Sequence, residues 1–165
     1  MSYFYKLFRR SIMYANSKNA LRIVFASLFI LVSHFSVLSQ SDKDFEIIKS
    51  KLLEQQDHWN NGDLDSFMET YWKSDDLQFG GASGITKGWQ KTLDNYKVRY
   101  PDRTAMGKLK FEVKDISRHS EKVVSLTGSW HLTRSIGDIG GHFLLIWRNI
   151  EDEWVIVVDH TSQAN

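Results

Sequence analysis

Two adjacent titratable residues, Asp159 and His160, follow an apolar run at Val155–Val158. Neighbouring residues on a strand point to opposite faces, so only one of the two can reach a cavity on a given side. If Trp154 and Ile156 face the interior, His160 does too, and the opposite parity places Asp159 there. We favour His160 as a general base or hydrogen-bond donor, because an imidazole changes its charge near neutral pH. Asp159 is the alternative base.

Aromatic residues form the second group that could bind a ligand. Ligand cavities are mostly apolar with a few convergent polar groups, so an aromatic wall favours a small aromatic or acidic ligand. The same side chains can also fill an ordinary core, and the sequence leaves both interpretations open. The candidate pocket residues are Trp59, Tyr71, Trp72, Phe79, Trp89, Tyr96, Tyr100 and Trp130.

Two further candidates, Arg134 and His142, flank the turn at Ser135–Gly141 and would lie close together across a hairpin. Arg134 shares its strand face with Trp130 and Leu132, so its guanidinium is a candidate for holding a ligand carboxylate at the mouth of a cavity. A solvated position at the rim is the alternative for this side chain.

Composition excludes several classes of chemistry. The chain has no cysteine, which excludes disulfides, thiol nucleophiles and cysteine-built metal sites. The five histidines after Gln40 lack the spacing of a metal-ligand set, so we predict neither a metal nor a cofactor. From Gln40 onward 16 basic residues face 20 acidic ones, and this acidic balance argues against binding to nucleic acid.

The N-terminal segment has the layout of a secretory signal peptide. Five basic residues and no acidic ones lie in residues 1–39, and a short apolar stretch ends in small residues before Gln40. We expect cleavage before Gln40, with Met13 as an alternative start, and a periplasmic or extracellular location for the product. The alternative is an uncleaved anchor, in which case this segment alone would contact the membrane.

Hydrophobic periodicity divides the rest of the chain into helices followed by strands. Apolar residues recur at helical spacing in three segments, and from Gly107 onward they alternate with polar residues. Pro101, the only proline, ends the third helix. The predicted helices cover residues 44–61, 64–71 and 89–100. The predicted strands cover residues 77–79 and 84–86, which form a small hairpin, and then 109–113, 124–132, 143–147 and 154–158.

This order of elements predicts an α+β fold, with three N-terminal helices packed on a strongly curved, mainly antiparallel sheet. The strands at Phe143–Trp147 and Trp154–Val158 are nearly all apolar, so we expect both of their faces to be covered. Because the helices cover only one face of the sheet, we expect a homodimer that forms through the outer face.

These elements, together with several short motifs, resemble the nuclear transport factor 2-like superfamily in its SnoaL-like and "domain of unknown function 4440" branches. The resemblance covers about residues 43–162, and implies a cone-like fold with a pocket between the helices and the concave sheet. It also implies a single domain over residues 40–165. The matching motifs are Trp59-Asn60-Asn61-Gly62-Asp63, Gly84–Trp89, Tyr100-Pro101, Gly128-Ser129-Trp130 and Trp154–Ser162.

Two functions are compatible with this resemblance, because members of the superfamily include both enzymes and modules without catalysis. The first is an exported small-molecule-binding or assembly module. The alternative is a SnoaL-like enzyme, an isomerase, cyclase or dehydratase, that uses a pocket histidine or aspartate as its general base. In that enzyme Tyr96 or Trp130 would orient the substrate.

Overall fold

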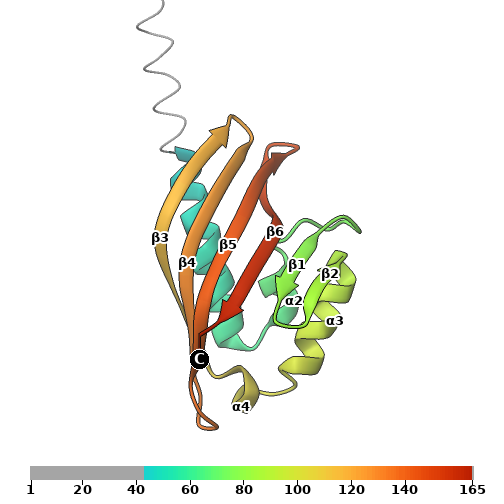
Figure 1. Cartoon of the computed structure of the whole chain (residues 1–165), viewed down its shortest axis with the longest axis vertical. Helices are drawn as coiled ribbons and strands as arrows, with labels where there is room; N and C mark the ends of the chain where they lie inside the picture. Colours follow the sequence, from blue (N-terminus) through green and yellow to red (C-terminus); the bar gives the residue numbers. More distant parts are fainter. Residues whose placement is uncertain (1–42, 165) are drawn as a thin grey trace, which may run out of the picture. The chain divides into compact units, whose positions relative to one another are not determined.

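The computed structural model describes residues 43–164, in which helices precede and flank a sheet (Figure 1). Residues 43–61 are helical. The other helices in this range are α2 (Leu64–Met68), α3 (Trp89–Arg99) and α4 (Arg103–Met106). The strands are β1 (Gln78–Gly81), β2 (Gly84–Lys87), β3 (Lys108–Ser120), β4 (Val123–Thr133), β5 (Ile139–Ile150) and β6 (Glu153–Gln163).

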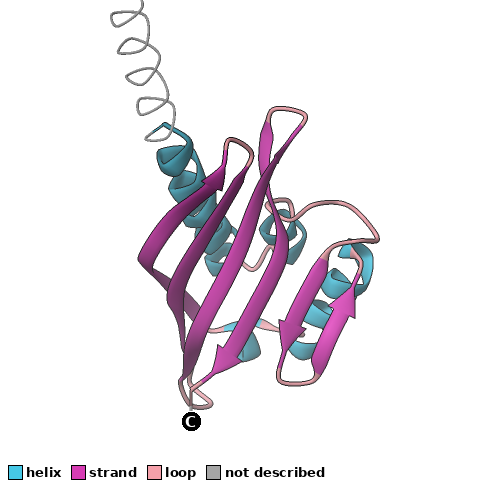
Figure 2. Cartoon of the chain, turned by 45° about the horizontal axis from the view of Figure 1, so that its top comes forward, coloured by secondary structure: helices cyan, strands magenta, loops and turns pink. Residues whose placement is uncertain are grey.

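All of these strands belong to one sheet, in the order β2-β1-β6-β5-β4-β3. Neighbouring strands are antiparallel except β1 and β6, which are parallel. The sheet is curved and unclosed. The helix at residues 43–61 lies behind β3, β4 and β5, and α3 lies behind β1 and β2 (Figure 2). The predicted α+β class, with helices on a curved and mainly antiparallel sheet, is therefore confirmed.

The core lies between the helix at residues 43–61 and the inner face of the sheet. Ile48 and Leu52 on the helix are buried in one hydrophobic cluster with Trp147 and Ile156 from the sheet. Burial of each of these side chains contributes roughly 1.5–3 kcal/mol of transfer free energy. The helix ends at Gly62, whose φ of 82° is readily adopted only by a residue without a side chain.

Polar side chains tie the end of this helix to β3. Asn60 donates through Nδ2 to the carbonyl of Leu109 at 3.0 Å and accepts from the Leu109 N–H at 2.7 Å. Arg103 donates to the carbonyls of Trp59 and Asn60, both at 2.9 Å. The Arg103 bonds attach α4, a single turn that the sequence did not predict, to carbonyls at the end of the helix.

A β-bulge in β6 changes which side chains face the helices. Ile146 and Trp147 are adjacent on β5, but their partners on β6 are Val158 and Ile156, so Val157 is one extra residue. An extra residue reverses the alternation of the side chains that follow it. Neither of the two parities considered from the sequence therefore holds along the whole of β6.

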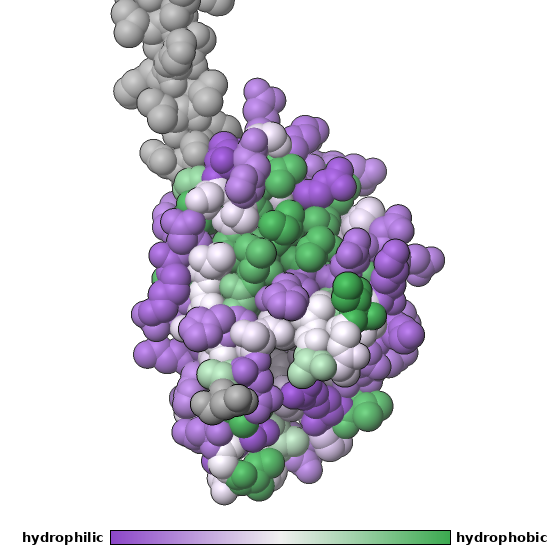
Figure 3. Space-filling model, viewed as in Figure 1, coloured by the Kyte–Doolittle hydropathy of each residue, from purple (hydrophilic) through white to green (hydrophobic). Residues whose placement is uncertain are grey.

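No described residues cover the outer faces of β5 and β6, so the expected cover on that side stays a prediction that depends on a partner copy. Leu144 is 40% exposed, and Ile146, Val155 and Val158 are half-buried. These four residues, called the outer patch below, belong to the apolar area that Figure 3 shows over β5 and β6. Within residues 43–164, the last four β-strands thus have one covered face and one open face.

The predicted signal peptide at residues 1–39 and the alternative start at Met13 lie outside the described residues. Cleavage before Gln40 and the domain boundaries at residues 40 and 165 stay predictions, and sequencing the N-terminus of the mature protein would test the cleavage. Within residues 43–164, no helix is both long enough and apolar enough to cross a lipid bilayer.

Candidate functional site

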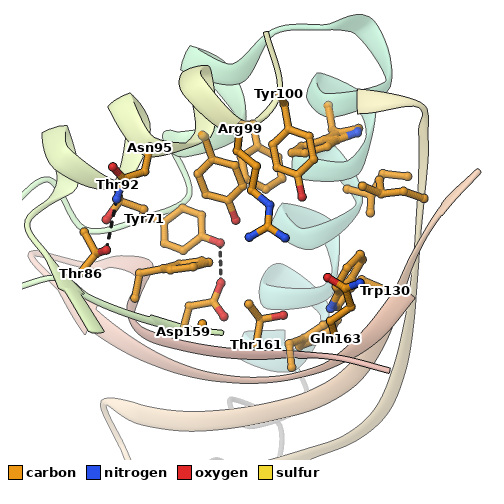
Figure 4. A pocket seen from close by; sticks show the side chains of 18 of the residues that line it. Tyr71, Thr86, Thr92, Asn95, Arg99, Tyr100, Trp130, Asp159, Thr161 and Gln163 are labelled. Carbon is orange, nitrogen blue, oxygen red and sulfur yellow. Dashed lines mark hydrogen bonds between the residues drawn. The ribbon is translucent and has the colours of Figure 1, made fainter. Parts of the chain in front are cut away.

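A cavity of about 350 Å³ lies between α3, the β1–β2 hairpin and the inner face of the sheet (Figure 4). All of the strands contribute to its wall, together with α3 and the helix at residues 43–61. Most of the wall is aromatic or aliphatic, and a few polar groups interrupt it, among them Asp159 and Arg99. Both the composition and the size are typical of a site for a small molecule.

An aromatic cluster forms one side of the cavity. The ring centroid of Trp59 lies 5.2 Å from that of Phe67 and 4.8 Å from that of Tyr100, and both pairs meet edge to face. Tyr96 contacts Phe67 at 5.3 Å and Phe79 at 5.6 Å in the same way. Edge-to-face pairs of this kind are favourable beyond the area that they bury, so they stabilise the packing of this wall.

Most of the predicted aromatic residues line the cavity, but Trp72 and Trp89 do not. The Trp89 indole donates to the carbonyl of Met68 at 2.8 Å, which holds it against α2. Trp72 lines a separate shallow hollow, because it follows Tyr71 in an extended segment and points the other way. The predicted residues found in the wall are Trp59, Tyr71, Phe79, Tyr96, Tyr100 and Trp130.

Asp159 lines the cavity and His160 does not. Asp159 is 5% exposed, whereas His160 is exposed and lies over Gly80 of β1. A Cβ atom at Gly80 would come within 2.8 Å of the His160 Nδ1, so a larger residue there would displace the imidazole. The preference for His160 as the inward-facing residue is corrected, and the cause is the extra residue Val157.

The Asp159 carboxyl is held by Tyr71. The Tyr71 hydroxyl donates to Asp159 Oδ2 at 2.7 Å, the bond drawn as a dashed line in Figure 4. Backbone bonds attach the Tyr71 segment to β6, from the Ile156 N–H to the Thr70 carbonyl at 3.0 Å and from the Trp72 N–H to the Ile156 carbonyl at 2.9 Å. The donor is therefore fixed beside the strand that carries the carboxyl.

Burial sets the protonation of this group. It raises the pKa of Asp159 to about 7, and the hydrogen bond from Tyr71 opposes that shift. Burial also raises the pKa values of Tyr71 and Tyr96 well above their usual value, and the negative charge of Asp159 adds to the effect. Near neutral pH Asp159 can thus gain or lose a proton, while both tyrosine hydroxyls remain protonated.

The other carboxyl oxygen, Asp159 Oδ1, is buried and has no hydrogen-bond partner among the described residues. The Trp147 indole N–H is the other buried side-chain group of this kind in residues 43–164, but it does not line the cavity. A buried polar atom without a partner costs about 1–3 kcal/mol. A ligand that donates a hydrogen bond to Oδ1 would remove this cost.

Arg134 and His142 are not brought together. The Arg134 backbone N–H donates to Asp138 Oδ1 and its side-chain Nε to the Gly137 carbonyl, both at 2.8 Å, so this residue closes the β4–β5 turn. His142 pairs with Ser129 further along the sheet, and its side chain is exposed. Neither residue lines the cavity, because Arg134 enters the turn and His142 points to the outer face.

Arg99 lines the cavity, and the sequence analysis missed it. Among the described residues of the wall it is the only basic one. Figure 4 shows its side chain extending from α3 into the cavity, and the guanidinium carbon lies 5.8 Å from the centroid of the Tyr100 ring. The signal was present, since Arg99 follows Tyr96 by three residues and thus shares its helix face. Thr161 and Gln163, which follow the bulge, were missed as well.

The described residues offer no evident metal site. Within residues 43–164, no group of three or more His, Asp or Glu side chains could hold a metal ion. Asp159 is the only carboxylate in the described wall of the cavity, and one carboxylate does not make the oxygen-rich shell that Mg²⁺ or Ca²⁺ requires. The ionisable groups in the described wall of the cavity are therefore Asp159, the tyrosines and Arg99.

Solved structures resemble this chain over most of its length. An NTF-2-like protein of unknown function from Shewanella oneidensis MR-1 is 37% identical, with a TM-score of 0.70. The match covers 72% of this chain and 98% of that protein. No protein-family model matches the chain, and no curated protein matches it significantly.

Two more distant structures share the fold. A ketosteroid isomerase-like protein from Erwinia carotovora atroseptica SCRI1043 is 15% identical, covering 73% of this chain and 95% of its own, with a TM-score of 0.60. A nuclear transport factor 2-like superfamily protein from Salmonella enterica serovar Typhimurium LT2 is 17% identical, covering 73% and 90%, with a TM-score of 0.58. At these identities the likeness concerns the fold and not the activity.

The raised pKa of Asp159 predicts a pH-dependent stability. The folded protein binds this proton more tightly than the unfolded chain, so the stabilisation is complete below about pH 4 and is lost as the pH rises through about 7. Asp159→Asn cannot titrate. Relative to wild type, the free energy of unfolding of the variant should rise by about 2.5 kcal/mol between pH 5 and pH 8.

Urea denaturation at both pH values measures this difference. Asp57→Asn is the matched control. It makes the same chemical change at a residue that is exposed on the helix at residues 43–61. A difference between Asp159→Asn and wild type that stays constant with pH would contradict the assignment.

Proposed function

We propose that this chain, which belongs to the nuclear transport factor 2-like superfamily, binds a small ring-containing molecule in the cavity. Members of the superfamily share a fold and not one activity, so the proposal rests on the site. One observation carries this proposal. Asp159 Oδ1 is a buried acceptor without a partner among the described residues, in the wall of an otherwise mostly apolar cavity. A hydroxyl or amine on a ligand would supply the missing donor.

A pair of two-ring probes tests the proposal. At pH 8, where Asp159 is ionised, the protein should bind 2-naphthol about tenfold more tightly than 2-methylnaphthalene, because only the naphthol donates a charge-assisted hydrogen bond. Asp159→Asn should reduce this preference to about threefold or less, since a hydrogen bond to a neutral amide is weaker. Fluorescence titration gives both dissociation constants.

His160→Gln is the matched control for this test. His160 is the next residue on β6, is exposed and points away from the cavity, so the preference for naphthol should be unchanged. Failure of both probes to bind, or a preference that survives in Asp159→Asn, would contradict the proposed function.

Proton transfer is a second candidate function, and the pKa of Asp159 favours it. A general base works best when its pKa lies near the operating pH. An ionised Asp159 could remove a proton from the carbon beside the carbonyl of a bound ketone, which leaves an enolate and a protonated Asp159, and then return the proton. The isomerase or cyclase alternative requires this step.

Hydrogen exchange into 2-tetralone distinguishes the two functions. In deuterated buffer, an enzyme should accelerate exchange at the carbons beside the carbonyl, and Asp159→Asn should lower that rate by about 10²–10⁴-fold. NMR follows the loss of the proton signals. If the probe binds but its exchange is not accelerated, the result would contradict catalysis of this kind and remain consistent with the binding function.

We also propose that the outer patch joins two copies of the chain. Ile146 and Val158 face each other across β5 and β6, and the outward residues Ser125 and Thr127 on neighbouring β4 carry no charge. A twofold contact through this face would bury apolar surface, with the exposed Arg148 of the same face at its edge. The patch lies on the opposite side of the sheet from the cavity, so such a dimer would leave the cavity accessible.

Sedimentation analysis of the purified protein tests the dimer. The measured mass of wild type should be twice that of one chain. The mass of Leu144→Glu should be that of a single chain, because a carboxylate buried in the contact is unfavourable. Ile85→Glu is the control, since Ile85 is 73% exposed on β2 and lies outside the outer patch. A wild-type protein that sediments as one chain would contradict this proposal.

A further inference from the structure

The described wall of the cavity has a second ionisable group of opposite charge to Asp159. Arg99 lines it from α3, and its guanidinium forms no hydrogen bond or ion pair among the described residues, beyond its position over the Tyr100 ring. A guanidinium carries five N–H donors in a planar fork. Arg99 is exposed, which places this fork at the open side of the cavity.

Two other basic residues near α3, Lys97 and Arg103, already have partners. Lys97 forms an ion pair with Asp65 at 2.8 Å, and the guanidinium of Arg103 donates to two helical carbonyls. These contacts give Lys97 and Arg103 roles in holding the helices. No comparable contact within the described residues accounts for Arg99, although it is the basic side chain that reaches the cavity.

We infer that the natural ligand is a ring-containing carboxylate whose carboxylate binds Arg99 and whose ring fills the cavity. This inference rests on the proposed binding function and names its ligand class. The planar fork of an arginine matches the two oxygens of a carboxylate and can bind them with two parallel hydrogen bonds. In the described wall Arg99 is the only cation, which suits a single negative charge better than a phosphate with two.

The charges of the two groups also set the orientation of this ligand. An ionised Asp159 would repel a carboxylate, whereas it attracts a hydroxyl or amine donor. Figure 4 shows Arg99 entering from α3, while Asp159 rises from β6 on the other side of the cavity. The carboxylate therefore lies toward Arg99 and the donor toward Asp159, with the aromatic cluster along the ring.

Matched acid and amide probes test the inference. At pH 8 the full-length wild-type protein should bind 6-hydroxy-2-naphthoate about tenfold more tightly than 6-hydroxy-2-naphthamide, which has the same shape without the charge. Arg99→Gln should abolish this preference, and Arg99→Lys should retain part of it, because an ammonium keeps the charge but not the fork. Titration calorimetry provides the dissociation constants.

Lys91→Gln is the control for charge alone. Lys91 lies on the same helix, is exposed and does not line the cavity, so its loss removes one positive charge without removing the fork. The preference for the acid should persist in this variant. A matching melting temperature for Arg99→Gln and wild type, expected for an exposed residue, shows that the variant is folded.

The outcomes separate this inference from the proposed function. If the acid and the amide bind wild type equally while 2-naphthol still depends on Asp159, the carboxylate assignment is overturned and the binding function stands. A preference for the acid that persists in Arg99→Gln would also overturn it. If 2-naphthol, 6-hydroxy-2-naphthoate and 6-hydroxy-2-naphthamide all fail to bind, both the proposed function and this inference are wrong.

Discussion

A single extra residue in β6 determines the chemistry of the cavity. Val157 reverses the alternation of side chains, so a strand that buries Trp154 and Ile156 in the core goes on to direct Asp159 into the cavity. Without it, the imidazole of His160 would occupy that position and the carboxyl would face outward. On the edge of β6 opposite β5, the neighbour of β6 changes at the bulge from the segment around Tyr71 to β1. The bulge therefore has a neighbouring segment on each edge of the strand.

The surroundings of Asp159 convert an ordinary carboxylic acid into a group that titrates near neutral pH. Burial disfavours its charge, and the Tyr71 hydroxyl restores part of that loss through one short hydrogen bond. The tyrosines remain neutral over the same range, and Arg99 remains charged at the opposite side. One cavity thus combines a titrating acceptor, neutral hydroxyls, a cation and an aromatic wall. This combination restricts the chemical class of the ligand more than the fold does.

The periodicity of the sequence was sufficient for the fold class and for most of the aromatic wall, because helical spacing and strict alternation follow directly from how each element is buried. It failed at Val157, since all residues from Val155 to Val158 are apolar and nothing in the run marks which one is extra. It also failed at Trp89, which has the right spacing but sits at the first turn of α3 beside α2. Arg99 could have been predicted from its spacing, because a residue three positions after Tyr96 lies on the same face of the helix.

The parallel pairing of β1 with β6 has a consequence for the order in which the protein can form. Phe79 pairs with Asp159 across 80 positions of sequence, and β6 lies in the middle of the sheet with β1 and β5 on its two sides. The ribosome makes β1 early and β6 after all of the other strands. Contacts between such distant segments are slow to form, and the hairpin of β1 and β2 has no sheet to join until β6 is made. The cavity is therefore completed late in folding, because β6, which carries Asp159, is made after the other described strands.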